Sequence, residues 1–447
     1  MKLSLITTTF EHNTKSEIQQ SYQFIPDQGI ENNVINLYPE MEYQTFEGFG
    51  GALTDSSGYV YSLMNEQQKK QMMDTYFGED QLNYNAVRIH IDSCDFSLDQ
   101  YEAMSDQEDL ELKSFDLSRT NKYIIPLLTD VKKAAGKVPE ILISPWSPPA
   151  FMKTNGERSH GGKLKKDYRT MWADYICRYI IEFRKLGFQI TKMTLQNEPN
   201  AVQTWDSCTY TGEEEKEFLR NYMYPALERN SLTEVEIFIW DHNKERVFER
   251  ACEVIDEETD KMITGLAFHW YSGDHFEALK LIKERFPNKK LILSETCIEY
   301  SKFDKDDYLA NAQKYAHDII GNINNGMSEF YDWNILLDEK GGPNHVGNYC
   351  DAPFLYDTLN HLLIERNTLS YIRHFSHFIT PGAKRIAYTK YTDQLEVTAL
   401  KNPDGKLVIV LLNRSEEKIP VVIRLKGEYF SMEIERQSIS TGIIDFK

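Results

Sequence analysis

Apolar runs alternate with amphipathic helical stretches eight times from about residue 43, and this alternation constrains the fold more than any other feature. Each run is apolar along its whole length, which is typical of a parallel strand covered by helices. Eight parallel strands, each followed by a helix, close a (β/α)8 TIM barrel. The runs are, in chain order, TFEGFGGALTD, NAVRIHID, EILISPW, KMTLQNEP, EIFIWDH, GLAFHWY, KLILSET and EFYDWNILL.

The stretch 167–187 has the clearest helical pattern. Its large apolar side chains recur every three or four residues, and Gly187 stands where a glycine commonly ends a helix. The pattern predicts that Trp172 and Tyr175 are core residues rather than sugar platforms. An open, doubly wound sheet is the competing fold, but GFGGALTD lacks the GxGxxG spacing of a dinucleotide-binding turn.

The two ends of the chain differ from its middle. Beyond about residue 380 short strands and turns follow one another, and NPDG at 402–405 predicts a hairpin. The first forty or so residues, including LSLITTTFE and NVINLYPEMEYQTF, also have strand patterns. We therefore expect an α/β chain with a catalytic barrel over 46–378 and an appended β-sandwich built from both termini, 1–45 and 379–447.

The formal net charge of −19 argues against nucleic acid as a partner and against electrostatic binding to an anionic membrane. No window approaches the roughly 18 apolar residues of a membrane span, so we expect no stable membrane insertion. The N-terminus lacks the apolar core of a secretory signal, and six scattered cysteines suit free thiols. We expect a cytoplasmic protein, with export by another route left open; the sequence does not predict the oligomeric state.

Two of the apolar runs end on a glutamate, Glu198 after KMTLQN and Glu295 after KLILS. Because catalytic residues of TIM barrels lie at the carboxyl ends of the strands, both carboxylates are expected in one mouth. Each could instead be a loop acid that caps a following helix. That alternative is weaker for the pair, since burying an unpaired charge after an apolar run is costly.

Two facing carboxylates suit glycoside hydrolysis. One is protonated and donates to the leaving oxygen, while the other is ionised and either attacks the anomeric carbon or activates water. The first course retains the anomeric configuration and the second inverts it. The separation of the two carboxylates decides between them, and the sequence does not give that separation.

Other polar and aromatic side chains fall within the predicted barrel strands or at their ends. Asn197 precedes one glutamate and could hydrogen-bond a sugar hydroxyl, while Arg88 could hold the nucleophile ionised. The further candidates at strand ends are Trp146, His269, Tyr271 and Trp333, whose aromatic rings suit packing on sugar faces. His242 and His269 lack HxH or HExxH spacing, so we expect no metal site.

These segments also carry a resemblance. The chain resembles glycoside hydrolase family 30, and within it the glucosylceramidase (acid β-glucosidase) branch, in an ordered set of motifs across nearly its whole length. The motifs are FEGFGGALTDSS, VRIHIDSCDFS, ISPWSPPAFMKTNG, TLQNEPNA, LAFHWYSG, LSETC, YDWNILLDEKGGPNHVGNYCDAP, HFSHFITPG and VIVLLNRS.

The resemblance implies a barrel with a β-sandwich, retaining chemistry, and neither metal nor cofactor. It implies that Glu198 is the general acid/base and that Glu295 is the nucleophile. Asn197 would hold the 2-hydroxyl of the sugar, with Arg88 and Tyr271 orienting Glu295. The resemblance assigns the remaining sugar contacts to Asp95, Trp146, Trp333 and Asn348.

The chain departs from the family in features that bear on cellular location and on substrate. Animal lysosomal relatives are secreted and have an N-terminal disulfide pair, whereas no cysteine precedes Cys94 here, which points to a bacterial-type intracellular enzyme. The loop 200–214 differs around Trp205, on the aglycone side. The main hypothesis is an exo-acting β-glucosidase that accepts glucosylceramide-like glycolipids. A β-xylosidase, β-fucosidase or β-1,6-glucanase, and an inactive carbohydrate-binding barrel, are the alternatives.

Overall fold

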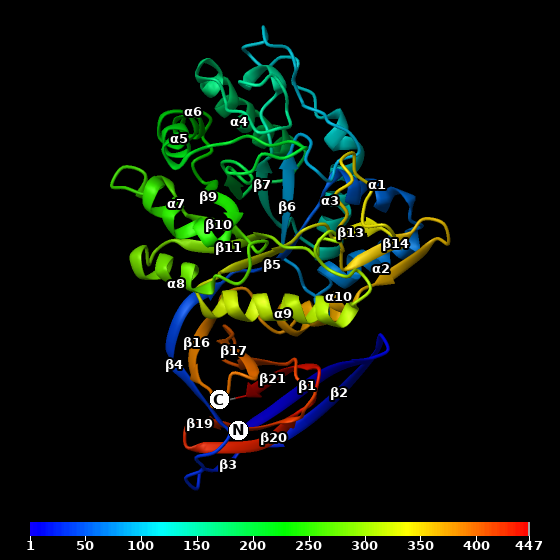
Figure 1. Ribbon diagram of the computed structural model, residues 1–447, viewed down its shortest axis with the longest axis vertical. Coiled ribbons are helices and arrows are strands. Elements are labelled where there is room, and N and C mark those ends of the chain that lie inside the picture. Colours follow the sequence, from blue (N-terminus) through cyan, green and yellow to red (C-terminus); the bar gives the residue numbers. More distant parts are fainter. Residues whose placement is uncertain (446–447) are drawn as a thin grey trace.

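The computed structural model describes residues 1–445; the last two residues of the predicted sandwich range, 446–447, lie outside the described residues. Figure 1 shows two bodies stacked along the long axis. A barrel with its helices forms the upper body, and a β-sheet that contains both termini forms the lower one. Strand β4 (Val34–Phe46) starts in the lower body and leads into the barrel.

The barrel is closed by eight parallel strands in the spatial order β10-β11-β12-β5-β6-β7-β8-β9, which confirms the predicted TIM barrel. Each predicted apolar run supplies one barrel strand. The strands are β5 (Gly48–Ala52), β6 (Ala86–Ile91), β7 (Glu140–Pro145), β8 (Lys192–Thr194), β9 (Glu236–Asn243), β10 (Gly265–His269), β11 (Lys290–Glu295) and β12 (Glu329–Asp332).

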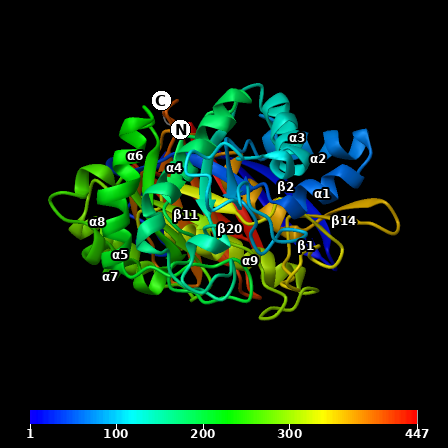
Figure 2. The ribbon, with the colours of Figure 1, turned by 90° about the horizontal axis from the view of Figure 1, so that it is seen from above.

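Helices cover the outer face of the barrel, and Figure 2 shows them around the strands from above. α9 lies between the barrel and the lower sheet in Figure 1. The helices are α1 (Asp55–Leu63), α2 (Glu66–Phe77), α3 (Ser118–Ala135), α4 (Arg169–Lys185), α5 (Gly212–Phe218), α6 (Tyr224–Arg229), α7 (Val247–Val254), α8 (Phe276–Arg285), α9 (Tyr308–Asn324) and α10 (Asn367–Ser376).

Helix α4 follows the predicted pattern closely. It starts directly after a 3-10 turn, and Gly187 beyond its end has a left-handed φ of 84°. Trp172 and Tyr175 are fully buried in the main core, which confirms that they are core residues. The Tyr175 hydroxyl donates to Asp92 at 2.7 Å, so even its polar atom is satisfied inside the protein.

The lower body is one sheet in the order β2-β1-β21-β18-β17-β16-β4-β19-β20-β3, within residues 1–445. β1 (Lys2–Glu11) pairs antiparallel with β21 (Ser438–Asp445), so segments from the two ends of the chain lie side by side. Apolar side chains from both ends, including Leu5, Ile409 and Ile423, share a second core. The other strands are β2 (Thr14–Gln23), β3 (Ile25–Pro26), β16 (Ala383–Thr389), β17 (Leu395–Lys401), β18 (Leu407–Asn413), β19 (Ile419–Leu425) and β20 (Glu428–Ile434).

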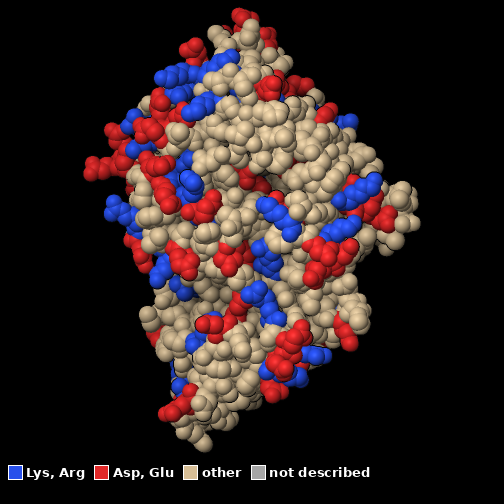
Figure 3. Space-filling view, viewed as in Figure 1, with Lys and Arg blue, Asp and Glu red and all other residues tan. Residues whose placement is uncertain are grey.

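The predicted hairpin at 402–405 joins β17 to β18, and Gly405 there has a φ of 89°. The run EFYDWNILL, predicted as one strand, is divided between β12 and β13 (Leu336–Asp338). β13 belongs to a small separate sheet with β14 (Phe354–Asp357) and β15 (Leu362–Glu365). The face of the molecule in Figure 3 intersperses Lys and Arg with Asp and Glu, so it offers no broad basic surface.

Candidate active site

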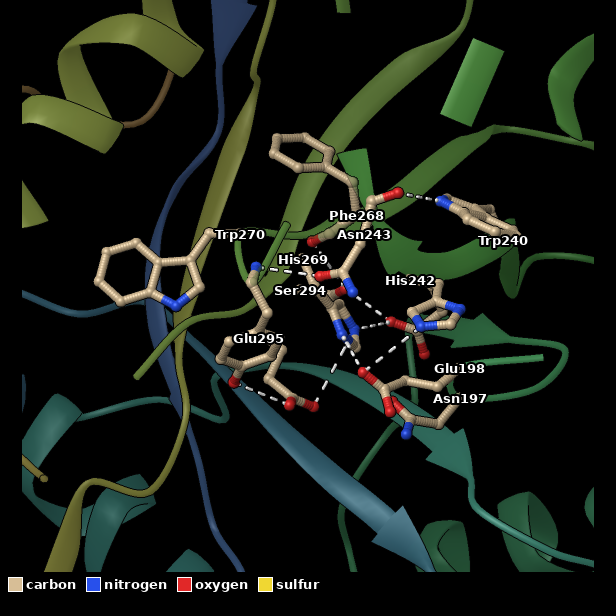
Figure 4. Close-up of polar contacts among 12 residues, drawn as sticks. Asn197, Glu198, Trp240, His242, Asn243, Phe268, His269, Trp270, Ser294 and Glu295 are labelled. Carbon is tan, nitrogen blue, oxygen red and sulfur yellow. Dashed lines mark hydrogen bonds and ion pairs between the residues drawn. The ribbon is translucent and has the colours of Figure 1, made fainter. Parts of the chain in front are cut away.

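A pocket opens at the carboxyl ends of the barrel strands. Its volume is about 140 Å³, so it is a small pocket. The lining residues are Asp95, Trp146, Asn197, Glu198, Gln203, Trp205, His242, Asn243, Tyr271, Glu295, Cys297, Glu299, Lys302, Trp333, Asn348 and Cys350. Figure 4 shows the polar contacts in one wall of this pocket.

β9 and β11, the barrel strands on either side of β10, each carry a β-bulge close to the pocket. The register between β9 and β10 shifts by one residue, which leaves Asp241 without a partner on β10. The register between β10 and β11 shifts in the same way and leaves Ser294 unpaired. Bulges re-aim side chains next to active sites. Here the Ser294 hydroxyl donates to Asp241 Oδ1 at 2.6 Å.

Arg88, on β6, lies fully buried beneath the pocket. Its guanidinium donates to Glu295 Oε2 at 2.6 Å and to Asn197 Oδ1 at 2.9 Å. It also donates to Asp241 Oδ2 at 3.0 Å and to the Ser144 hydroxyl at 3.2 Å. Because the donors of a guanidinium have a fixed fork geometry, this single side chain sets the relative positions of these four groups.

Glu295 is held at the end of β11 by donors on both carboxylate oxygens. Oε2 accepts from Arg88, and Oε1 accepts from the Tyr271 hydroxyl at 2.9 Å. Hydrogen bonds to a charged carboxylate are stronger than those to a neutral one. These contacts therefore favour the ionised form of Glu295 and fix its orientation toward the pocket.

Glu198 does not end a strand, contrary to the prediction. β8 stops at Thr194, and Glu198 lies in the irregular segment beyond it with a left-handed φ of 46°. Beyond the end of β8, the Glu198 N–H donates to the carbonyl of Asp241, the bulged residue of β9, at 2.9 Å. Such a backbone conformation costs of order 1–3 kcal/mol in a non-glycine residue and is common at functional sites.

His269, at the end of β10, lies between the two glutamates in Figure 4. Its Nδ1 is 3.3 Å from Glu198 Oε1, and its Nε2 is 3.0 Å from Asp241 Oδ1 and 4.0 Å from Glu295 Oε2. Although burial lowers the pKa of this imidazole, the carboxylates of Glu295 and Asp241 raise that pKa to about 9. His269 is therefore a cation at neutral pH.

The two glutamates titrate as a coupled pair, with pKa values that lie far apart. Burial raises the pKa of Glu295, against the opposing charges of His269 and Arg88. Burial would also raise the pKa of Glu198, but His242 and His269 lower it to about 2. Between these two pKa values the pair holds a single proton, and these pKa directions place it on Glu295 when no substrate is bound, whereas acid-assisted cleavage by Glu198 requires it on Glu198.

Asp241 completes the charge balance of the site. Its side chain is fully buried; Arg88 and His269 outweigh this burial and hold the pKa of its carboxyl well below the usual range. The Thr194 hydroxyl donates to its Oδ2 at 2.6 Å. With Asp241 ionised and one proton on the glutamate pair, the two negative charges match the two positive charges of Arg88 and His269.

The aromatic residues of the pocket form one cluster. The rings of Trp146 and Trp333 stack with centroids 5.2 Å apart and an interplanar angle of 18°. The Arg88 guanidinium carbon lies 4.9 Å from the Trp146 ring centroid and 5.4 Å from that of Trp333. Nearby, Asn348 Nδ2 donates to Asp95 Oδ2 at 3.0 Å. The pocket thus has an aromatic wall and, in its lining, the hydrogen-bonded pair of Asp95 and Asn348.

The structure brings all ten predicted site residues to one place. Eight of them line the pocket; behind it, Arg88 contacts Glu295 and Asn197, and His269 contacts Glu198. The sequence analysis missed Asp241 and Ser294, which lie in the apolar runs EIFIWDH and KLILSET. Their positions at strand ends are a signal, but the bulges that turn both side chains to each other are not visible in the sequence.

Within residues 1–445 no three His, Cys, Asp or Glu side chains are grouped so as to hold a metal ion. In the same part of the chain no helix has both the length and the apolar character needed to span a bilayer.

Two family models match two separate parts of the chain. The model of the glycosyl hydrolase family 30 TIM-barrel domain matches residues 46–379, and the model of the β-sandwich domain of that family matches residues 382–442. Lysosomal acid glucosylceramidase of Mus musculus is 31% identical over 409 residues, which is 87% of this chain and 79% of the mouse protein.

Solved structures agree with this assignment. The crystal structure of SrfJ from Salmonella typhimurium covers 100% of both chains with a TM-score of 0.96 and 36% identity. The endo-β1,6-glucanase BT3312 also covers 100% of both chains, with a TM-score of 0.89 and 26% identity. The family models match both the barrel with its paired carboxylates and the sheet beneath it, and the chain therefore belongs to glycosyl hydrolase family 30 and is a glycoside hydrolase.

Proposed function

We propose that the chain is a retaining, exo-acting β-glycosidase that hydrolyses β-glucosides. The unequal surroundings of the two pocket carboxylates support this proposal most directly. Glu295 accepts donors on both oxygens, whereas Glu198 has a longer contact of 3.3 Å with His269. Two-step displacement needs Glu295 ionised and the proton of the pair on Glu198, so the proposal includes transfer of this proton to Glu198 when a glycoside binds.

In the first step Glu295 Oε attacks the anomeric carbon of the bound sugar. The glycosidic bond breaks, and Glu198 gives its proton to the departing oxygen, which leaves as an alcohol. In the second step Glu198, now ionised, takes a proton from water while that water attacks the anomeric carbon. The bond to Glu295 breaks, and the sugar leaves with its original configuration.

The remaining pocket residues support a glucose-type sugar in this site. Asn197, held by Arg88 at 2.9 Å, is available to the 2-hydroxyl. Asp95 and Asn348 form a hydrogen-bonded pair suited to hydroxyls on the far side of the ring. Trp146, Trp333 and Tyr271 supply apolar and aromatic surface.

The leaving group is proposed from the relatives. The similarity to the mouse lysosomal acid glucosylceramidase makes a glucosylceramide-like glycolipid, and hence a place in sphingolipid metabolism, the first substrate to test. A β-1,6-glucan is the second candidate, because the endo-β1,6-glucanase BT3312 has a TM-score of 0.89. Xylosides and fucosides belong in the same comparison, since one or two hydroxyl contacts separate these sugars.

The test compares nitrophenyl β-glucoside, β-xyloside, β-fucoside and β-galactoside, followed by glucosylceramide and a β-1,6-glucan. We expect the highest kcat/KM on the glucoside among the nitrophenyl substrates. A higher kcat/KM on another sugar would contradict the glucosidase proposal, while the assignment as a glycoside hydrolase would stand. Binding of glycosides without any turnover would instead favour an inactive carbohydrate-binding barrel.

A further inference from the structure

Two cysteines line the candidate active site, and neither has a part in the proposed mechanism. Cys297 lies two residues beyond Glu295, and Cys350 lies two residues beyond Asn348. Both are 1% exposed, yet both line the pocket and are reached through its mouth. Both thiols are free.

The backbone brings the two cysteines onto facing segments. Residues 298–300 run antiparallel to residues 349–351: Glu299 pairs with Cys350, and the Asp351 N–H donates to the Ile298 carbonyl at 2.8 Å. Because Cys297 lies two residues before Glu299, both thiols leave the same face of this short ladder. The two side chains belong to one buried cluster beside the pocket.

The thiol pair also touches the groups that orient the proposed nucleophile. The Tyr271 hydroxyl is 3.4 Å from Cys297 Sγ and donates to Glu295 Oε1 at 2.9 Å. On the other segment, the Asn348 side chain donates to Asp95. A bond between the two sulfurs would therefore act on both sides of the pocket at once.

We propose that Cys297 and Cys350 form a disulfide when a small peroxide enters the pocket, and that this disulfide reversibly inactivates the enzyme. In the first step one thiol loses its proton, and the thiolate attacks an oxygen of hydrogen peroxide; the O–O bond breaks, sulfenic acid forms, and the departing hydroxide takes up a proton to give water. In the second step the other thiol displaces water from the sulfenic acid and forms the S–S bond. Overall, two thiols are oxidised and one peroxide is reduced to two waters.

Inactivation follows from the geometry of the new bond. A disulfide requires the sulfurs to approach to about 2.05 Å, much closer than two free thiols in contact. Cys297 would be drawn toward Cys350 and would no longer contact the Tyr271 hydroxyl. Since a displacement of about 1 Å in a reacting group can cost on the order of a hundredfold in rate, we expect activity to fall by roughly tenfold or more.

The reaction should be slow at neutral pH. Burial raises the pKa of Cys297 well above its ordinary value, and the pKa of Cys350 is also raised. Since the thiolate is the reactive form, oxidation is expected to be faster at pH 9 than at pH 7.

The experiment treats reduced, desalted protein with hydrogen peroxide at pH 7 and pH 9. Peptide mapping by mass spectrometry locates disulfides, and hydrolysis of nitrophenyl β-glucoside is measured before and after dithiothreitol. Cys350→Ser and Cys350→Ala remove one partner. Cys252→Ser is the matched control, because it removes an exposed cysteine on α7.

We expect a Cys297–Cys350 peptide and a loss of activity that dithiothreitol restores, in the wild type and in Cys252→Ser. Neither Cys350 variant should show a loss that dithiothreitol restores. Absence of the cross-linked peptide, or a cross-linked protein with unchanged activity, would overturn the proposal. The activity measurement rests on the proposed function, whereas the peptide map reports on the thiols directly, so failure of one is distinguishable from failure of the other.

Discussion

Asp241 and Ser294 are the unpaired residues of two adjacent β-bulges, and their side chains meet at 2.6 Å beneath the pocket. This contact joins the strand that leads to His242 with the strand that ends on Glu295. Asp241 also contacts Arg88 and His269, which in turn contact the two proposed catalytic glutamates. The bulges thus place a buried carboxylate where it sets the charge of the whole site.

Replacing Asp241 with asparagine should affect both stability and pH dependence. Breaking a buried ion pair by removing one partner costs about 3–5 kcal/mol of unfolding free energy. The pKa of His269 should also fall, because the Asp241 carboxylate is one of the groups that raise it. Denaturant unfolding and the pH profile of kcat/KM measure the two effects.

The matched control for this variant is Asp318→Asn. Asp318 is similarly buried and pairs with Lys244 at 2.5 Å, but it lies on α9 outside the pocket. We expect it to lose comparable stability while keeping the wild-type pH profile. An Asp241→Asn profile identical to that of the control would show that Asp241 is only structural.

Glu295→Gln should abolish turnover without unfolding the protein. The amide keeps the size of the side chain but cannot act as the nucleophile. Glu329→Gln is the control, because it removes another buried carboxylate of the barrel, at the start of β12. Circular dichroism checks the fold and nitrophenyl β-glucoside checks the activity. Activity of Glu295→Gln above a small fraction of wild type would exclude Glu295 as the nucleophile.

The pH profile of kcat/KM should be bell-shaped, because activity requires a single proton on the glutamate pair. Activity is lost at low pH when the second proton binds, and at high pH when the single proton leaves. The His269 cation lowers the pKa of both Glu198 and Glu295. His269→Gln should therefore shift both limbs to higher pH, whereas His160→Gln, at an exposed site, should leave them in place.

A second histidine should govern acid stability. His374 is buried between the hydroxyls of Thr441 and Thr8, each at 2.8 Å, and burial lowers its pKa to about 3. Below its ordinary pKa of about 6.5 the unfolded chain binds a proton that the folded chain does not. This histidine therefore makes stability fall as the pH drops from about 6.5 toward 3, by at most about 1.4 kcal/mol per pH unit.

His374→Gln should remove that contribution, so its Tm should depend less on pH than the wild-type Tm over this range. His160→Gln again provides the comparison, since His160 is exposed. Thermal melts at several pH values between 4 and 7 give the slopes. An unchanged slope in His374→Gln would contradict a neutral buried imidazole.

The barrel and the pocket residues could be predicted because their signals are local. Buried parallel strands are apolar along their whole length, and residues at their carboxyl ends converge in one mouth. Glu198 and Glu295 stand out because each is a charge after an apolar run. Arg88 stands out for a related reason, since it is a lone charge inside the run NAVRIHID.

The features that were missed depend on tertiary contacts. The predicted strand ending at Glu198 is too long: β8 ends at Thr194, and Glu198 lies in an irregular segment with a left-handed φ. In the sequence Asp241 is only a polar residue at the end of an apolar run. The fold shows that it contacts both Arg88 and His269.

The most direct test of the central claim is the mass of the protein after reaction with a 2-deoxy-2-fluoro-β-glucosyl fluoride. The fluorine slows the second step, so a covalent glycosyl-enzyme should accumulate if the reaction retains configuration. The account predicts one added sugar, located on Glu295 by peptide mapping and absent from Glu295→Gln. Hydrolysis of β-glucosides to α-glucose as the first product, with no adduct on Glu295, would contradict the account.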